Sequence, residues 1–185
     1  MKLYLYHYYE RKHGPFRNLS SLSLEAGEEV LRKLKQEPEV FASNRSDDYL
    51  RIRRELENTA RELFIAKGGK PKKEYPHYMT LGQCEWIQGW YKDGCELRVD
   101  LEQFSPEILS FTYGDLFPTM RYKDGKEYRE QVYTKEEIMD LINRYGLPQQ
   151  WNPEGKNGPE RYIEVQIWDD IAIRGKDIED PPYGL

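Results

Sequence analysis

The chain has 185 residues, a length that fits one domain with a hydrophobic core of its own. Charged residues make up 33% of it and the net charge is -5, which argues against a broadly basic surface for nucleic acid. The apolar runs fall short of the roughly 20 residues that a membrane span requires, so we expect no membrane segment. Two cysteines without paired spacing, and an N-terminal stretch that soon turns polar, indicate a reduced cytoplasmic setting and no metal site.

The first predicted element is a strand over residues 3–9, LYLYHYY. Side chains alternate along a strand, which places Leu5 and His7 on one face and Tyr6 and Tyr8 on the other. Both faces are bulky, so we expect an interior strand of a sheet. The same residues also suit the floor of a polar pocket, and the sequence leaves these two alternatives open.

Helix signals follow at three places along the chain. Ser23 is a candidate N-cap for a helix that ends before Pro38, although Gly27 interrupts it. The longest helix is predicted after Ser46 and runs to Gly68-Gly69, with an apolar stripe at helical spacing. A third helix is predicted by the capping box that Thr134 forms with Glu137.

The remaining segments predict a sheet. Extended or hairpin segments are expected at residues 40–43, 77–81, 95–101, 109–113, 121–133 and 161–168, with a short helix over 84–91. Strands and helices alternate early and segregate later, which predicts an α+β fold with a mixed, mostly antiparallel sheet of about six strands and three main helices. We expect one domain over residues 1–170 and an acidic, frayed tail over 171–185.

Two residues of the predicted strands are candidates for catalysis. His7 lies in the first strand, and Glu164 lies in the last strand on the face opposite to Ile163 and Val165. If the two strands are neighbours, an imidazole and a carboxylate converge on one cleft and can act as acid and base. The alternatives are a core histidine bonded to a backbone carbonyl and a glutamate on a solvated sheet face.

An anion site is a candidate between the short strand and the longest helix. Ser43 and Arg45 lie there, where backbone amides, the helix dipole and a guanidinium could hold a phosphate. An ordinary capped helix with a nearby arginine explains the same residues. No glycine-rich nucleotide motif, catalytic serine motif or metal motif is present, and we interpret Asp115 as a turn former and Cys84 as a buried filler.

A rival function follows from the aromatic and basic residues. The Lys70–Lys73 stretch is followed by tyrosines and by Trp86 and Trp90, a mixture that single-stranded nucleic acid or a protein partner can use. Acidic residues are interleaved with the basic ones, so a solvated helix face explains them as well. The rival prediction is a non-catalytic interaction module.

The order of several segments resembles the ADP-ribosyltransferase-like fold. These are LYHYY before a helix, then FASNRSDDYL, the strand CELRVDLEQF, YGDLFP and finally RYIEVQIW. The chain is also similar to bacterial proteins without an assigned function. The resemblance covers most of the chain in outline and implies a cleft for a nucleotide such as NAD.

The resemblance also implies roles for individual residues. His7 would hold the ribose, and Tyr49 or Tyr78 would stack on the nicotinamide ring. Glu164 would stabilise the positive charge that develops on the ribose as the bond between carbon and nitrogen breaks. The sequence prediction is therefore a cytoplasmic α+β protein that binds a small nucleotide, as a transferase or a relic of one, in a tyrosine-rich cleft.

Overall fold

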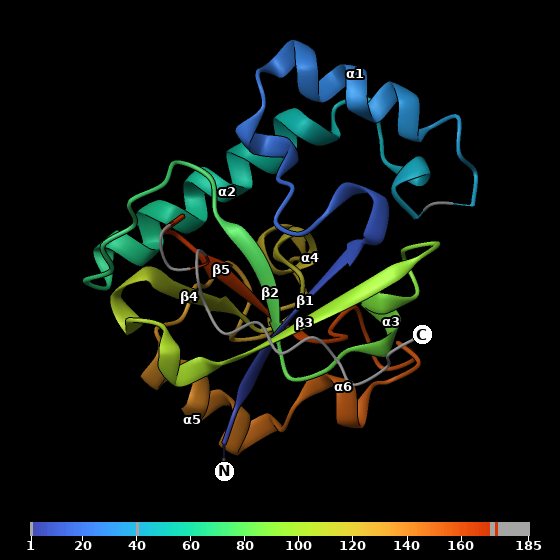
Figure 1. The fold of residues 1–185 in the computed structure, drawn as a ribbon. Helices are drawn as coiled ribbons and strands as arrows, with labels where there is room; N and C mark the ends of the chain where they lie inside the picture. Colours follow the sequence, from blue (N-terminus) through green and yellow to red (C-terminus); the bar gives the residue numbers. More distant parts are fainter. Residues whose placement is uncertain (1, 40, 171–172, 174–185) are drawn as a thin grey trace.

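A computed structural model describes residues 2–39, 41–170 and 173 of the chain. Its centre is one antiparallel sheet of five strands in the order β3-β1-β2-β5-β4 (Figure 1). The strands are β1 (Tyr4–Glu10), β2 (His77–Leu81), β3 (Gly94–Asp100), β4 (Leu109–Thr112) and β5 (Ile163–Ile167). The first strand is thus an interior strand, as its two bulky faces predict.

The pairing registers assign each side chain to a face of the sheet. Leu5 is paired with Leu81 and Val99, and Leu81 is paired with Ile163, so these side chains share one face. That face carries the larger apolar core. Glu164 follows Ile163 in β5 and therefore lies on the other face, which carries most of the buried polar side chains of the strands.

Helices cover both faces of the sheet (Figure 1). On the apolar face, α5 (Lys135–Tyr145) packs Ile138 and Leu141 into the larger core. On the polar face, α2 (Tyr49–Ala66) and α4 (Leu116–Arg121) pack against the end of β5, where Phe64 and Trp168 are fully buried. The other helices are α1 (Leu24–Leu34), α3 (Glu85–Gln88) and α6 (Pro148–Trp151), with short 3₁₀ turns between elements.

The α+β class is confirmed, as are the three main helices, α1, α2 and α5. Within the described residues, the sheet has five strands, and all of their pairings are antiparallel. The capping box is present, because the Thr134 hydroxyl accepts a hydrogen bond from the Glu137 amide and the Glu137 carboxylate accepts one from the Thr134 amide. No helix in the described part of the chain has the length and apolar character to cross a bilayer.

Two sequence predictions of extended structure are wrong. Residues 41–44 form a 3₁₀ turn (Phe41–Asn44) in place of a strand, and residue 40 lies outside the described part. The hairpin expected over 121–133 is absent, because Arg121 ends α4, the residues after it form turns, and only Tyr133 bridges to Phe111 of β4. The helix α4 was also not predicted, because Asp115 caps it where the turn chemistry alone predicts a break. Nearly all of the predicted tail lies outside the described residues.

Gly27 in α1 is required by packing. A Cβ atom at this position would collide with Cδ2 of Leu50, a side chain of α2 that is 1% exposed. Helix propensity alone predicts that Gly27→Ala stabilises the protein by up to about 1 kcal/mol. We expect the opposite, a loss of about 1 to 3 kcal/mol from overpacking, measured by urea denaturation. Glu28→Ala on the exposed side of α1 is the control, and equal stability of G27A and wild type would contradict the packing argument.

Candidate functional site

A cleft of about 650 Å³ lies on the polar side of the sheet. Its walls come from the segment before α2, from α3 and its following turn, from α4 and from the loop before β5. The side chains that line it fall into three kinds. The cations are Arg45, Arg121 and Arg161, the rings are Phe41, Tyr49, Trp86, Trp90, Phe117 and Tyr122, and the acid is Asp115.

The cations of the cleft take no part in the ion pairs of the described residues. In the described part of the chain, no carboxylate forms an ion pair with Arg45, Arg121 or Arg161. Arg45 lies over the ring of Tyr49, 4.4 Å from its centroid, and burial lowers the pKa of its guanidinium. Asp115 of the same cleft attracts Arg45 without forming an ion pair with it, so the buried cation is only partly compensated and this wall of the cleft favours an anion.

Arg161 is positioned by the loop of residues 152–161. Asn152 is 1% exposed, and its amide donates to the carbonyl oxygens of Gly158 (2.9 Å) and Glu160 (2.7 Å) while its oxygen accepts from the Asn157 amide. Gly155 has a φ of +73°, and a Cβ there would press on the Arg161 guanidinium. The loop therefore needs its asparagine and this glycine to place the Arg161 side chain.

The Arg161 side chain itself is only partly bonded. Its guanidinium donates to the Pro153 carbonyl at 2.5 Å and lies 4.3 Å from the Trp86 ring. Its Nε atom is buried and has no hydrogen-bond partner in the described structure. Spare donor capacity thus remains at the edge of the cleft.

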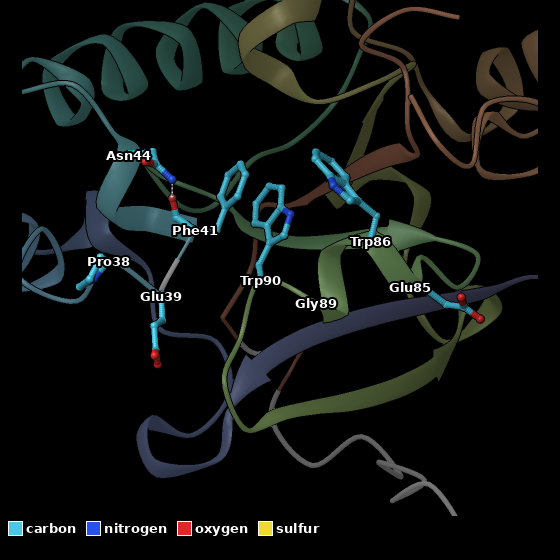
Figure 2. Close-up of a pocket in the computed structure, with 8 residues that line it drawn as sticks. All are labelled: Pro38, Glu39, Phe41, Asn44, Glu85, Trp86, Gly89 and Trp90. Carbon is cyan, nitrogen blue, oxygen red and sulfur yellow. Dashed lines mark hydrogen bonds between the residues drawn. The ribbon is translucent and has the colours of Figure 1, made fainter. Parts of the chain in front are cut away.

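Aromatic rings lie beside these arginines in the cleft. Phe41 stacks on Trp90 with centroids 4.0 Å apart, and Trp86 meets Trp90 edge to face at 4.9 Å. Figure 2 shows these three rings in a row, with the carboxylates of Glu39 and Glu85 directed away from them. The three rings also border a second, smaller cavity of about 390 Å³. A row of rings beside unpaired arginines suits a ligand that is both planar and anionic.

The floor of the cleft is acidic, and hydrogen bonds hold its carboxylate in place. Asp115 accepts from the Phe117 amide with one oxygen (2.8 Å) and from the Tyr162 hydroxyl with the other (2.9 Å). The same hydroxyl lies 3.2 Å from Glu164, which is 7% exposed. A hydroxyl has only one proton, so it bonds to both carboxyl groups only when one of these two groups supplies a proton of its own.

Burial explains why Glu164 is the group that keeps this proton. Removal from water, followed by the nearby charge of Asp115, raises the pKa of Glu164 to about 8. Glu164 is therefore mostly neutral near pH 7 and can donate to Tyr162, while Tyr162 donates to Asp115. Burial also raises the pKa of Tyr162 well above its usual range, so the hydroxyl keeps its proton.

Behind Glu164, hydrogen bonds continue along the polar face of β5. The Gln166 amide donates to Glu164 and to Thr112 (both 3.1 Å), and the Gln166 oxygen accepts from Ser110 at 2.8 Å. Trp168 closes the series by donating its indole N–H to Ser110 at 2.8 Å. Nearly all of these groups are buried, so the network fixes the rotamer of Glu164 from behind.

Tyr78 belongs to a neighbouring buried cluster and does not line the cleft. Its hydroxyl donates to Glu57 at 2.6 Å, and Glu57 also pairs with Arg53 at 2.9 Å. Arg53 lies over the Tyr78 ring. Burial raises the pKa of Tyr78 well above its usual range, so this tyrosine packs as a neutral group. Of the two tyrosines expected to stack on a ligand, Tyr49 is the one that lines the cleft, where it also stacks on Phe117.

His7 is a structural histidine. Its Nδ1 is 2.9 Å from the Tyr78 carbonyl, and its Nε2 accepts a hydrogen bond from the Phe16 amide at 2.9 Å. Only a neutral ring with the proton on Nδ1 satisfies both contacts, and burial accordingly lowers the pKa of His7 to about 4. The structure selects the alternative of a core histidine bonded to a backbone carbonyl.

The structure does not bring His7 and Glu164 into one cleft. His7 shares the face of Leu5 and Ile163, whereas Glu164 lies on the opposite face. Their strands are also separated by β2. The expected convergence is therefore absent, because the register of β5 turns its polar side chains away from the imidazole.

Of the other residues that the sequence suggested for a site, some line the cleft and others do not. Arg45 lines the cleft, but Ser43 lies in the preceding 3₁₀ turn and is not among the lining residues. The basic loop is neutralised within the chain, since Lys70, Lys72 and Lys73 pair with Glu107, Asp169 and Asp170. Cys84 is buried, as expected of a filler, and its burial raises the pKa of the thiol. Among the described residues no cluster of three metal-binding side chains occurs.

Sequence reasoning missed several residues of the cleft. Asp115 was interpreted as a turn former, and the available signal was its position as a helix N-cap followed by aromatic and basic residues. Arg121 and Arg161 carried no local signal at all. They enter the cleft only because α4 and the loop of residues 152–161 meet across the end of β5.

These features define an α+β protein with a cleft lined by arginines and aromatic rings. Compared with protein-family models, with curated proteins and with solved structures, the chain has no significant match.

Proposed function

We propose that the cleft binds a nucleotide, with NAD and ADP-ribose as the candidate ligands. The observation that carries this proposal is Arg45, a desolvated guanidinium that forms no ion pair within the described residues and lies beside a wall of aromatic rings. Guanidinium groups bind phosphate through paired hydrogen bonds, and aromatic side chains stack on bases. The volume of about 650 Å³ is in the range of small-molecule sites.

The proposal covers binding and includes no step that needs His7. The imidazole lies across the sheet from the cleft, and both of its nitrogens are engaged with backbone groups. Glu164 supports the floor of the cleft through Tyr162. A cytoplasmic location belongs to the same proposal, since nucleotides are abundant there and both cysteines are free thiols.

Removing the Arg45 guanidinium is expected to weaken nucleotide binding. Hydrogen bonds to a charged group contribute about 1.5 to 3 kcal/mol, so Arg45→Ala should lower the affinity for ADP-ribose roughly 10- to 100-fold. Isothermal titration calorimetry of the purified chain with ADP-ribose and NAD measures this change. Arg45→Lys keeps the charge without the planar fork and should fall between wild type and R45A.

Arg51 offers a matched control on the same side of the molecule. It is exposed, it pairs with Asp48 and Glu55, and it does not line the cleft. Arg51→Ala should therefore bind ADP-ribose as wild type does. No heat signal and no thermal shift for wild type at millimolar NAD, ADP-ribose and ADP would overturn the proposed function.

The interaction module stays a prediction without a specific supporting observation. Trp86, Trp90 and Trp151 are half-buried, and the first two form part of the cleft wall.

A further inference from the structure

Asp115 has unused acceptor capacity at the floor of the cleft. Each of its oxygens accepts one hydrogen bond from within the chain, from the Phe117 amide and from the Tyr162 hydroxyl. A carboxylate has about four acceptor positions, so roughly half of its capacity is left. The side chain is only half-buried, and the free side lines the cleft.

The orientation of this carboxylate is fixed before any ligand arrives. The hydrogen bond from the Phe117 amide is the N-cap bond of α4. The Tyr162 hydroxyl is held in place by its contact with Glu164, which is itself hydrogen-bonded to Gln166. No ion pair joins Asp115 to Arg45, Arg121 or Arg161 in the described structure. The cleft therefore combines an anion-binding wall with a separate, preorganised acceptor on its floor.

We infer that Asp115 accepts hydrogen bonds from the ribose hydroxyls of the nucleotide, so that the cleft prefers nucleotides that carry these hydroxyls over their 2′,3′-dideoxy analogues. This inference rests on the proposed function. Phosphate groups contain no hydrogen-bond donor at neutral pH, and they are repelled by a carboxylate. The donors of a nucleotide are its sugar hydroxyls and base amino groups, and a fixed carboxylate that accepts from ribose hydroxyls is a recurring solution in nucleotide sites.

A comparison of sugar variants tests the inference. Wild type should bind ADP roughly 10- to 100-fold more tightly than 2′,3′-dideoxy-ADP, because the dideoxy sugar leaves the carboxylate without its donors. Asp115→Asn keeps an N-cap side chain and so should keep α4 folded. In D115N the two affinities should become nearly equal, with the affinity for 2′,3′-dideoxy-ADP close to that of wild type.

Asp100 provides the matched control. It also caps a short turn, accepting from the Glu102 amide at 3.0 Å, and it lies outside the cleft. Asp100→Asn should retain the full preference for ADP. Circular dichroism melting of each variant checks that the fold is intact.

The other possible results of this experiment would contradict either the role of Asp115 or the proposed function. Wild type that binds both nucleotides equally, or D115N that keeps the preference, would overturn the role of Asp115 and leave nucleotide binding in place. A wild-type chain that binds neither ADP nor its dideoxy analogue would overturn the proposed function together with this inference.

Discussion

Glu164→Gln is expected to stabilise the protein at alkaline pH and to leave its stability at pH 5 nearly unchanged. Glutamine has the shape of a protonated glutamate, and it can accept from Gln166 and donate to Tyr162 as the neutral acid does. The substitution therefore preserves the buried network in its neutral form. It removes only the possibility of a buried negative charge.

The direction of this pH effect follows from the number of protons that the native and unfolded states bind. The pKa of Glu164 is raised from about 4.5 to about 8 on folding, so between these values the native state binds a proton that the unfolded state lacks. The contribution of Glu164 to the free energy of unfolding is fully present below pH 4.5 and is lost as the pH rises to about 8. At pH 8.5 the loss for wild type is on the order of 3 to 5 kcal/mol, and E164Q should not suffer it.

Guanidinium chloride denaturation of both proteins at pH 5 and pH 8.5 measures the effect. The difference between variant and wild type is the relevant quantity, because other titrating groups cancel in it. Glu55→Gln, an exposed pair partner of Arg51, is the control, and its difference from wild type should be within about 0.5 kcal/mol at both pH values. An E164Q difference that stays constant with pH would refute the neutral state of Glu164.

The second large effect is expected at Glu160, which is fully buried. Its carboxylate pairs with Arg129, which is 6% exposed, at 2.5 Å and with Lys126 at 3.1 Å. Glu160→Gln leaves the buried Arg129 with Asp124 as its acidic partner, and removal of one member of a buried ion pair costs about 3 to 5 kcal/mol. The free energy of unfolding should fall by this amount in urea denaturation.

A substitution of Asp124 distinguishes the contribution of the buried Glu160 charge from that of the bidentate contact between Asp124 and Arg129. It binds Arg129 through two oxygens but is partly exposed, and the contact with Arg129 lowers the pKa of Asp124 to about 2. Asp124→Asn should therefore cost less than E160Q. The double variant R129M/E160L, which removes both charges, should recover much of the loss. A loss below 1 kcal/mol in E160Q would show that Arg129 is satisfied without Glu160.

Sequence reasoning predicted the elements whose signals are local. The Ser23 cap, the capping box at Thr134 and the alternation in residues 163–167 each depend on neighbouring residues, and each element is present. The helix over 116–121 was missed because a side chain, Asp115, caps it within a segment rich in turn formers. A cap is decided by the path of the backbone, which turn chemistry alone does not specify.

The cleft was predicted only in part. Arg45 was found from its place just before a predicted helix, and Tyr49 was named only through the family resemblance. The pairing of His7 with Glu164 required a strand register that the sequence does not specify. A shift of one residue in a strand exchanges its two faces, so a prediction about facing side chains is only as good as the predicted register. Arg161 depends on contacts between segments far apart in the chain, which no local pattern reveals.

The place of β5 between β2 and β4 also constrains how the molecule assembles. Before residues 163–167 are synthesised, β3, β1 and β2 can pair with one another, but β4 has no partner strand in the sheet. During translation, the growing chain therefore presents an open β2 edge and an unpaired β4 until β5 leaves the ribosome. Such long-range closure slows folding and exposes strand edges, which makes this interval the one in which a chaperone would be most useful.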